Sequence, residues 1–131
     1  MDLKENTNQV FQQVTKAIQE TGREDGSVSV IAVTKYVDIA TAANLIDQGV
    51  KHIGENRVDK FLEKYHALSD KDVTWHLIGS LQRRKVKDVI PYVDYFHALD
   101  SLKLAQEIQK RADRTVKCFL QVNISGEEKQ N

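Results

Sequence analysis

The sequence has little of several residue types that mark particular classes of protein. Its 131 residues include one cysteine and one proline, and its 19 basic and 19 acidic side chains cancel. A lone cysteine excludes an internal disulfide and fits a reducing compartment. Zero net charge gives no overall field that would attract nucleic acid or an anionic membrane. We therefore predict a cytoplasmic protein that binds neither of them.

Long apolar runs and the motifs of common sites are also scarce. No stretch approaches the ~20 apolar residues of a membrane span, and no apolar segment follows Met1 as in a signal peptide. The chain has no Gly-x-Gly-x-x-Gly, P-loop, His-Glu-x-x-His or paired cysteines. We interpret Cys118, in an apolar run, as a small core residue. His52, His76 and His97 fall on successive predicted strands, where core or pocket positions are favoured over a metal site.

The chain does contain a regular alternation of two hydrophobic patterns. Apolar, β-branched runs predict strands at 29–34, 50–54, 73–78, 93–98 and 115–122. Helical spacing of apolar residues predicts helices at 3–20, after Asp38 and Ser101 as N-caps, around 58–65, and at 81–90 before Pro91.

The predicted strands recur at intervals of about 20–23 residues, with a helix inside each interval. This spacing predicts parallel βαβ units with right-handed crossovers, and the nearly continuous apolar strands are typical of a sheet covered on both faces. We predict one α/β domain over 1–131, with an amino-terminal helix in 1–22 and five βα units in 28–125.

Polar residues follow each predicted strand. Because the carboxyl ends of parallel strands meet at one edge of the sheet, these residues should converge there. They are Lys35, Glu55-Asn56, Gly79-Ser80, Asp100-Ser101 and Asn123-Ser125. A partly desolvated lysine amine has a lowered pKa and can form a Schiff base with a carbonyl. Lys35 is therefore a candidate reactive group, although it can also simply mark the exit of the strand into water.

Five separated motifs, in order, resemble one family. They are Ala32-Val33-Thr34-Lys35, Gly54-Glu55-Asn56-Arg57-Val58, Trp75-His76-Leu77-Ile78-Gly79-Ser80-Leu81-Gln82, Lys85-Val86-Lys87, and Gln121-Val122-Asn123-Ile124 with Glu127-Glu128-Lys129. The chain is similar to the pyridoxal 5'-phosphate (PLP) homeostasis family, also called proline synthase co-transcribed or YggS-like. The resemblance implies a (β/α)8 TIM-type barrel like that of alanine racemase, preceded by a helix.

The resemblance also implies a cofactor and its contacts. Lys35 occupies the position of the family's lysine that binds the PLP aldehyde, Asn56 a position facing the cofactor ring, and His76 a pocket-facing strand position. Members of the family bind the cofactor, and no catalytic turnover is generally assigned to them. PLP-dependent enzymes are therefore candidate partners. A racemase-type PLP enzyme and an aldolase-like Schiff-base enzyme without PLP remain alternatives.

Other interpretations of these residues stay open. Asn56 also suits a helix N-cap, and a lone strand histidine such as His76 is often a hydrogen-bonded core group. Arg84 stands where many family members have Asn, which removes any hydrogen bond assigned to that Asn. The basic run 83–87 is interpreted as a solvated helix face rather than a nucleic-acid site, since no aromatic residues interleave it.

The chain is shorter than the fold that it resembles. A (β/α)8 barrel takes about 250 residues, whereas this sequence has 131 and five predicted strands. We interpret it as a form truncated after the fifth strand, without the segments that hold the cofactor phosphate in the family. An unclosed barrel exposes edge strands and an apolar face, so we predict that the chain either forms a homodimer across that surface or rearranges its last segment.

Overall fold

The computed structural model describes residues 2–124, so Ser125 and the Glu127-Glu128-Lys129 motif lie outside the described residues. The helices are α1 (Leu3–Glu20), α2 (Ile39–Asp47), α3 (Val58–Ala67), α4 (Val86–Val89) and α5 (Leu102–Arg111). The strands are β1 (Ile31–Val33), β2 (His52–Glu55), β3 (Thr74–Leu77), β4 (Tyr95–Leu99) and β5 (Lys117–Leu120). No helix in the described part of the chain is both long and apolar enough to cross a membrane.

The helix N-caps expected from the sequence are present. The Asp38 carboxylate accepts a hydrogen bond from the Thr41 amide at 2.8 Å, and the Ser101 hydroxyl accepts one from the Leu104 amide at 3.1 Å. Each bond satisfies an amide that the first helical turn would otherwise leave unpaired. Gly49 follows α2 with φ of +105°, a conformation that only glycine adopts without strain.

All five strands are parallel and lie in the sheet in chain order, β1-β2-β3-β4-β5. The register pairs Ala32 with Ile53, Ile53 with Trp75, and Leu77 with Phe96. A doubly wound sheet reverses its strand order at a switch point, whereas successive neighbours without reversal build the wall of a barrel. The predicted α/β fold is therefore confirmed, with β1 and β5 as the two edges of the described sheet.

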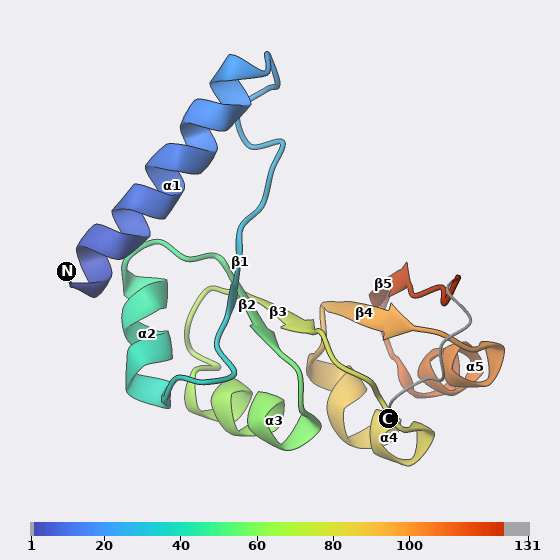
Figure 1. Cartoon of the computed structure of the whole chain (residues 1–131). Helices are drawn as coiled ribbons and strands as arrows, with labels where there is room; N and C mark the ends of the chain where they lie inside the picture. Colours follow the sequence, from blue (N-terminus) through green and yellow to red (C-terminus); the bar gives the residue numbers. More distant parts are fainter. Residues whose placement is uncertain (1, 125–131) are drawn as a thin grey trace.

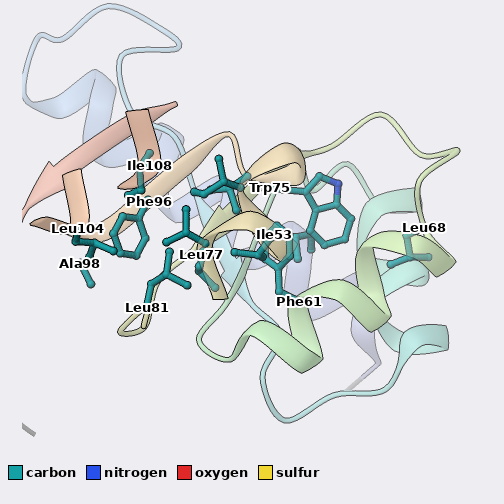
Figure 2. Packing of buried hydrophobic residues seen from close by; sticks show 14 of the residues in the cluster. Ile53, Phe61, Leu68, Trp75, Leu77, Leu81, Phe96, Ala98, Leu104 and Ile108 are labelled. Atoms are coloured by element: carbon teal, nitrogen blue, oxygen red, sulfur yellow. The ribbon is translucent and has the colours of Figure 1, made fainter. Parts of the chain in front are cut away.

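The hydrophobic core lies between one face of the sheet and the helices α2 to α5, which follow one another along the strands (Figure 1). Ile53, Trp75, Leu77 and Phe96 supply the strand side of this core (Figure 2). Phe61 on α3 is fully buried and meets the Trp75 ring edge-on, with ring centroids 5.6 Å apart. Because side chains alternate along a strand, His52, His76 and His97 project from the opposite face.

Helix α1 stands apart from the sheet and helices, and its amino-terminal end lies beside α2 (Figure 1). Its Ile18 is buried, but its Val10 is 48% exposed. The helix therefore covers little of the core.

Two sequence expectations are wrong in detail. The predicted helix over 81–90 is a chain of short turns, with 3-10 helices at 83–85 and 90–92 on either side of α4. Pro91, which lacks a backbone N–H, lies in the second of these turns and prevents a longer helix. Cys118 is exposed rather than part of the core, because β5 is an edge strand whose four residues are all exposed.

Candidate functional site

A buried lysine ties the carboxyl ends of β1 and β2 to α3. The Lys64 amine donates hydrogen bonds to the Thr34 carbonyl oxygen at 2.6 Å and to Glu55 Oε2 at 2.8 Å. The Thr34 hydroxyl also donates to Glu55 Oε2. The Lys64 and Glu55 side chains are only 6% and 0% exposed. We call Thr34, Glu55 and Lys64 the strand-end cluster.

The strand-end cluster restrains the segments where the candidate residues begin. Thr34 directly precedes Lys35, and Glu55 directly precedes Asn56. A buried charge is tolerated only when it is paired and hydrogen-bonded, so this arrangement strongly penalises any shift of either strand end relative to α3. Glu55 Oε1 is buried without a hydrogen-bond partner among the described residues, which leaves one acceptor position of the cluster unused.

Lys35 lines a cavity of about 490 Å³ at the end of β1, together with Tyr36, Asp38, Lys60 and Lys64. Its amine lies 5.1 Å from the centroid of the Tyr36 ring. Hydrogen bonds from Thr41 hold the pKa of the Asp38 carboxyl below its usual value. Lys35 is itself exposed, so the desolvation expected from its position is not supplied by the described residues.

Asn56 lies in a different cavity. It lines a cleft of about 990 Å³ with Ser80 and Ser101, residues that follow β3 and precede α5. A Cβ on Gly79 would meet the backbone carbonyl of Asn56, so glycine is required for this close approach between two strand ends. The N-cap of α3 is Arg57, not Asn56, and Arg57 makes no side-chain cap bond. The N-cap interpretation of Asn56 is therefore wrong.

His76 is the centre of a row of three hydrogen-bonded histidines. Its Nε2 lies 3.0 Å from His52 Nδ1, and its Nδ1 lies 2.9 Å from His97 Nε2. The Tyr95 ring stacks on the His76 ring, with centroids 4.7 Å apart and planes 9° from parallel. Both nitrogens of His76 are thus engaged by neighbouring imidazoles on the face of the sheet away from the helices.

The electrostatics of this row keep its central imidazole neutral. Burial, together with the neighbouring His97 and His52, lowers the pKa of His76 to about 4. Burial also lowers the pKa of His97. A neutral imidazole donates through one nitrogen and accepts through the other, so both hydrogen bonds of His76 run in one direction along the row.

The three histidines do not converge on one point, because His76 directs its two nitrogens to opposite neighbours. Within residues 2–124 no group of three or more histidine, cysteine, aspartate or glutamate side chains is arranged to hold a metal ion. The row is a hydrogen-bonded structure rather than a metal centre.

The structure thus separates the three residues expected to share a site. Lys35 and Asn56 follow neighbouring strands but line different cavities, and His76 lies in the histidine row. Sequence reasoning missed Lys64, because a lysine in an amphipathic helix is usually solvated. One signal was available: Lys64 lies three residues after Phe61 and four before Leu68, on the apolar stripe of α3.

The fold and the lysine after β1 define a class of protein, an α/β chain whose consecutive parallel strands form part of a barrel wall. Comparison with known proteins narrows this class. The chain is 38% identical over 131 residues to the pyridoxal phosphate homeostasis protein of Aquifex aeolicus, covering 98% of this chain. It is 31% identical to the proteins of the same name in Pseudomonas aeruginosa and Escherichia coli, covering 94% and 96% of the chain. The family resemblance of the motifs is thereby confirmed.

Solved structures give the same answer for the fold. PipY of Synechococcus elongatus without PLP matches with a TM-score of 0.72 and 33% identity, covering 84% of this chain and 53% of PipY. PipY with PLP bound matches with a TM-score of 0.62 over 73% of this chain and 46% of PipY. The chain spans 55–58% of the length of the three curated relatives named above. No protein-family model matches it.

We predict that Lys64→Met destabilises the protein by about 3–5 kcal/mol, because it leaves the buried Glu55 carboxylate unpaired. The matched control is Lys60→Met on the same helix, whose pair with Glu63 is 3.7 Å long and half exposed. That control should cost about 0.5 kcal/mol or less. Urea unfolding measures both. The double variant Glu55→Gln with Lys64→Met should recover part of the loss, and equal costs for the two lysine variants would contradict the cluster's role.

The histidine row predicts a loss of stability in acid. The folded-state pKa of His76, about 4, lies below its ordinary value of 6.5, so the unfolded chain takes up the proton first as the pH falls. The contribution of neutral His76 to the free energy of unfolding is complete above about pH 6.5. It decreases toward pH 4, by at most about 1.4 kcal/mol per pH unit. His76→Gln, which keeps a donor and an acceptor, should show a shallower dependence of the unfolding free energy on pH. The same dependence in both proteins would count against a neutral His76.

Proposed function

We propose that this chain binds PLP, with the cofactor joined to Lys35 as a Schiff base, and acts in cofactor homeostasis rather than in catalysis. The observation that carries the proposal is that Lys35, two residues after the first strand of the sheet, lines a cavity. The curated relatives named pyridoxal phosphate homeostasis proteins support it, as does a PipY structure with PLP bound.

The chemistry of the Lys35 cavity fits such a cofactor. Lys60 lines the same cavity as Lys35, and its half-exposed ammonium group suits a phosphate dianion. Lys64 also lines the cavity, but its amine is held by Glu55 and the Thr34 carbonyl. Lys35 is exposed, so its amine is accessible to an aldehyde of small-molecule size. The cavity volume of about 490 Å³ falls in the usual range for small-molecule sites, about 300–1,000 Å³.

The protein's part in this reaction is to supply and position an amine. The neutral form of the Lys35 amine is the nucleophile; its nitrogen forms a C=N bond with the aldehyde carbon, and the aldehyde oxygen leaves as water. When bound, PLP supplies an electron-withdrawing ring. The strand-end cluster restrains Thr34, the residue before Lys35, and so limits where the amine can reach.

Asn56 and His76 enter the proposal as supporting residues. Asn56 begins the loop after β2, the strand beside β1, and we propose that it contacts the cofactor ring. His76 lies on the sheet face away from the helices and outside the Lys35 cavity, and we propose that it faces the interior of the barrel as a pocket residue.

The proposed role is binding without turnover, and recipient PLP-dependent enzymes are its proposed partners. A racemase of the same fold needs a second base on the opposite side of the ring. Within residues 2–124 the Lys35 cavity contains one phenol, that of Tyr36, which adjoins Lys35 in the sequence and lies beside its amine.

The direct test replaces Lys35. After incubation with PLP and reduction with borohydride, the unaltered chain should carry one pyridoxyl phosphate group, and Lys35→Ala should carry none, because the nucleophilic nitrogen is gone. Intact-mass spectrometry followed by peptide mapping measures the label. Lys87→Ala, an exposed lysine on α4 outside both cavities, serves as the control and should label fully. Full labelling of Lys35→Ala at another lysine would refute the assignment.

We further propose that a second copy of the chain covers the open face of the sheet. The edges β1 and β5 have no further strand beside them among the described residues. Apolar side chains on or after these strands are strongly exposed, with Val33 at 53%, Phe119 at 54% and Val122 at 63%. An exposed apolar edge strand readily pairs with another strand.

Analytical ultracentrifugation tests this arrangement. The chain should sediment as a dimer at micromolar concentration, and Phe119→Lys with Val122→Lys should shift it to monomer, because charge on the edge opposes pairing. Leu102→Lys, on α5 and 74% exposed, is the control and should stay dimeric. A monomeric unaltered chain would overturn the proposal.

A further inference from the structure

A cleft of about 990 Å³ lies apart from the cavity of Lys35. Its walls come from the loops after β2, β3 and β4 and from the first residues of α3 and α5. These loops lie at the carboxyl ends of parallel strands, the edge at which α/β proteins bind ligands.

The charges that line the cleft are mainly positive. Arg57, Arg83, Lys85 and Lys103 lie in its wall, against two carboxylates. Of these carboxylates, Asp59 is already held by Arg57 through two hydrogen bonds of 3.1 and 2.8 Å. Arg83, Lys85 and Lys103 make no ion pair with any described residue. Two cations from the 3-10 turn at 83–85 and one from α5 thus line the same cleft.

The floor of the cleft is apolar. Leu81 and Leu104 are 7% and 3% exposed and line it from the β3 loop and α5, and the half-buried Val58 contributes from α3. Small-molecule sites combine an apolar lining with a few convergent polar groups in this way. A floor without charge, bordered by cations, suits a ligand with a flat apolar portion and a strongly anionic group.

We propose that this cleft is a second binding site, for an organic phosphate that carries a planar ring. The phosphate would lie against Arg83 and Lys103, and the ring over Leu81 and Leu104. Arginine and lysine are the side chains that bind phosphate oxygens most strongly. The cleft does not include Lys35, so binding there requires no covalent bond and does not depend on the proposed cofactor linkage.

Two probes distinguish the sources of such a phosphate. ADP represents nucleotides, and pyridoxine 5'-phosphate represents the vitamin ring without the aldehyde that would react with Lys35. Isothermal titration of the full chain should give saturable binding of at least one probe at a stoichiometry of one, and adenosine or pyridoxine, which lack phosphate, should bind about ten-fold more weakly or worse. If neither phosphate binds saturably, or if the phosphate-free compounds bind as well, the proposal is overturned.

Paired charge reversals locate the binding. Arg83→Glu with Lys103→Glu should weaken the bound phosphate about ten-fold or more, because it replaces two attractions by repulsions. Lys87→Glu with Lys110→Glu changes the net charge equally at exposed positions outside the cleft and should stay within about two-fold. Equal weakening by both pairs would refute the site. Borohydride labelling of Lys35 should be unchanged in the cleft variant, so failure of one proposal leaves the other measurable.

Discussion

The ion pair between Lys64 and Glu55 is the interaction on which the arrangement of the strand ends depends. It is fully enclosed, and through the Thr34 carbonyl it joins β1, β2 and α3 at one point. A buried charge pair contributes little net stability compared with apolar groups of the same shape, but it strongly penalises any arrangement that separates the partners. Its effect is therefore on position: the residues that follow Thr34 and Glu55 are held in a defined relation.

The two faces of the sheet have different chemistry. One face packs Ile53, Trp75 and Leu77 against the helices in a continuous apolar core. The other carries the hydrogen-bonded row of His52, His76 and His97 and ends in the exposed side chains of β5. The first face supplies the burial that stabilises the chain, and the second is the one that a barrel would enclose.

The fold followed from the sequence because its signals are local. Apolar runs, helical spacing and the N-caps Asp38 and Ser101 each depend on neighbouring residues, and their recurrence implied parallel strands in chain order. Pairwise contacts between distant residues could not be derived in this way. Neither the link from Lys64 to Glu55 nor the engagement of both His76 nitrogens has a sequence signal of its own. Burial was also overestimated for Cys118 and Lys35, because the strand and loop that carry them border open space.

The central claim is that Lys35 is the residue that holds PLP, and a crystal structure of the chain grown with PLP tests it most directly. The account predicts continuous electron density from Lys35 Nζ to the aldehyde carbon of the cofactor, with the strand-end cluster intact beneath it. Density that joins the cofactor to Lys60 or Lys64, or cofactor bound with no link to Lys35, would contradict the account.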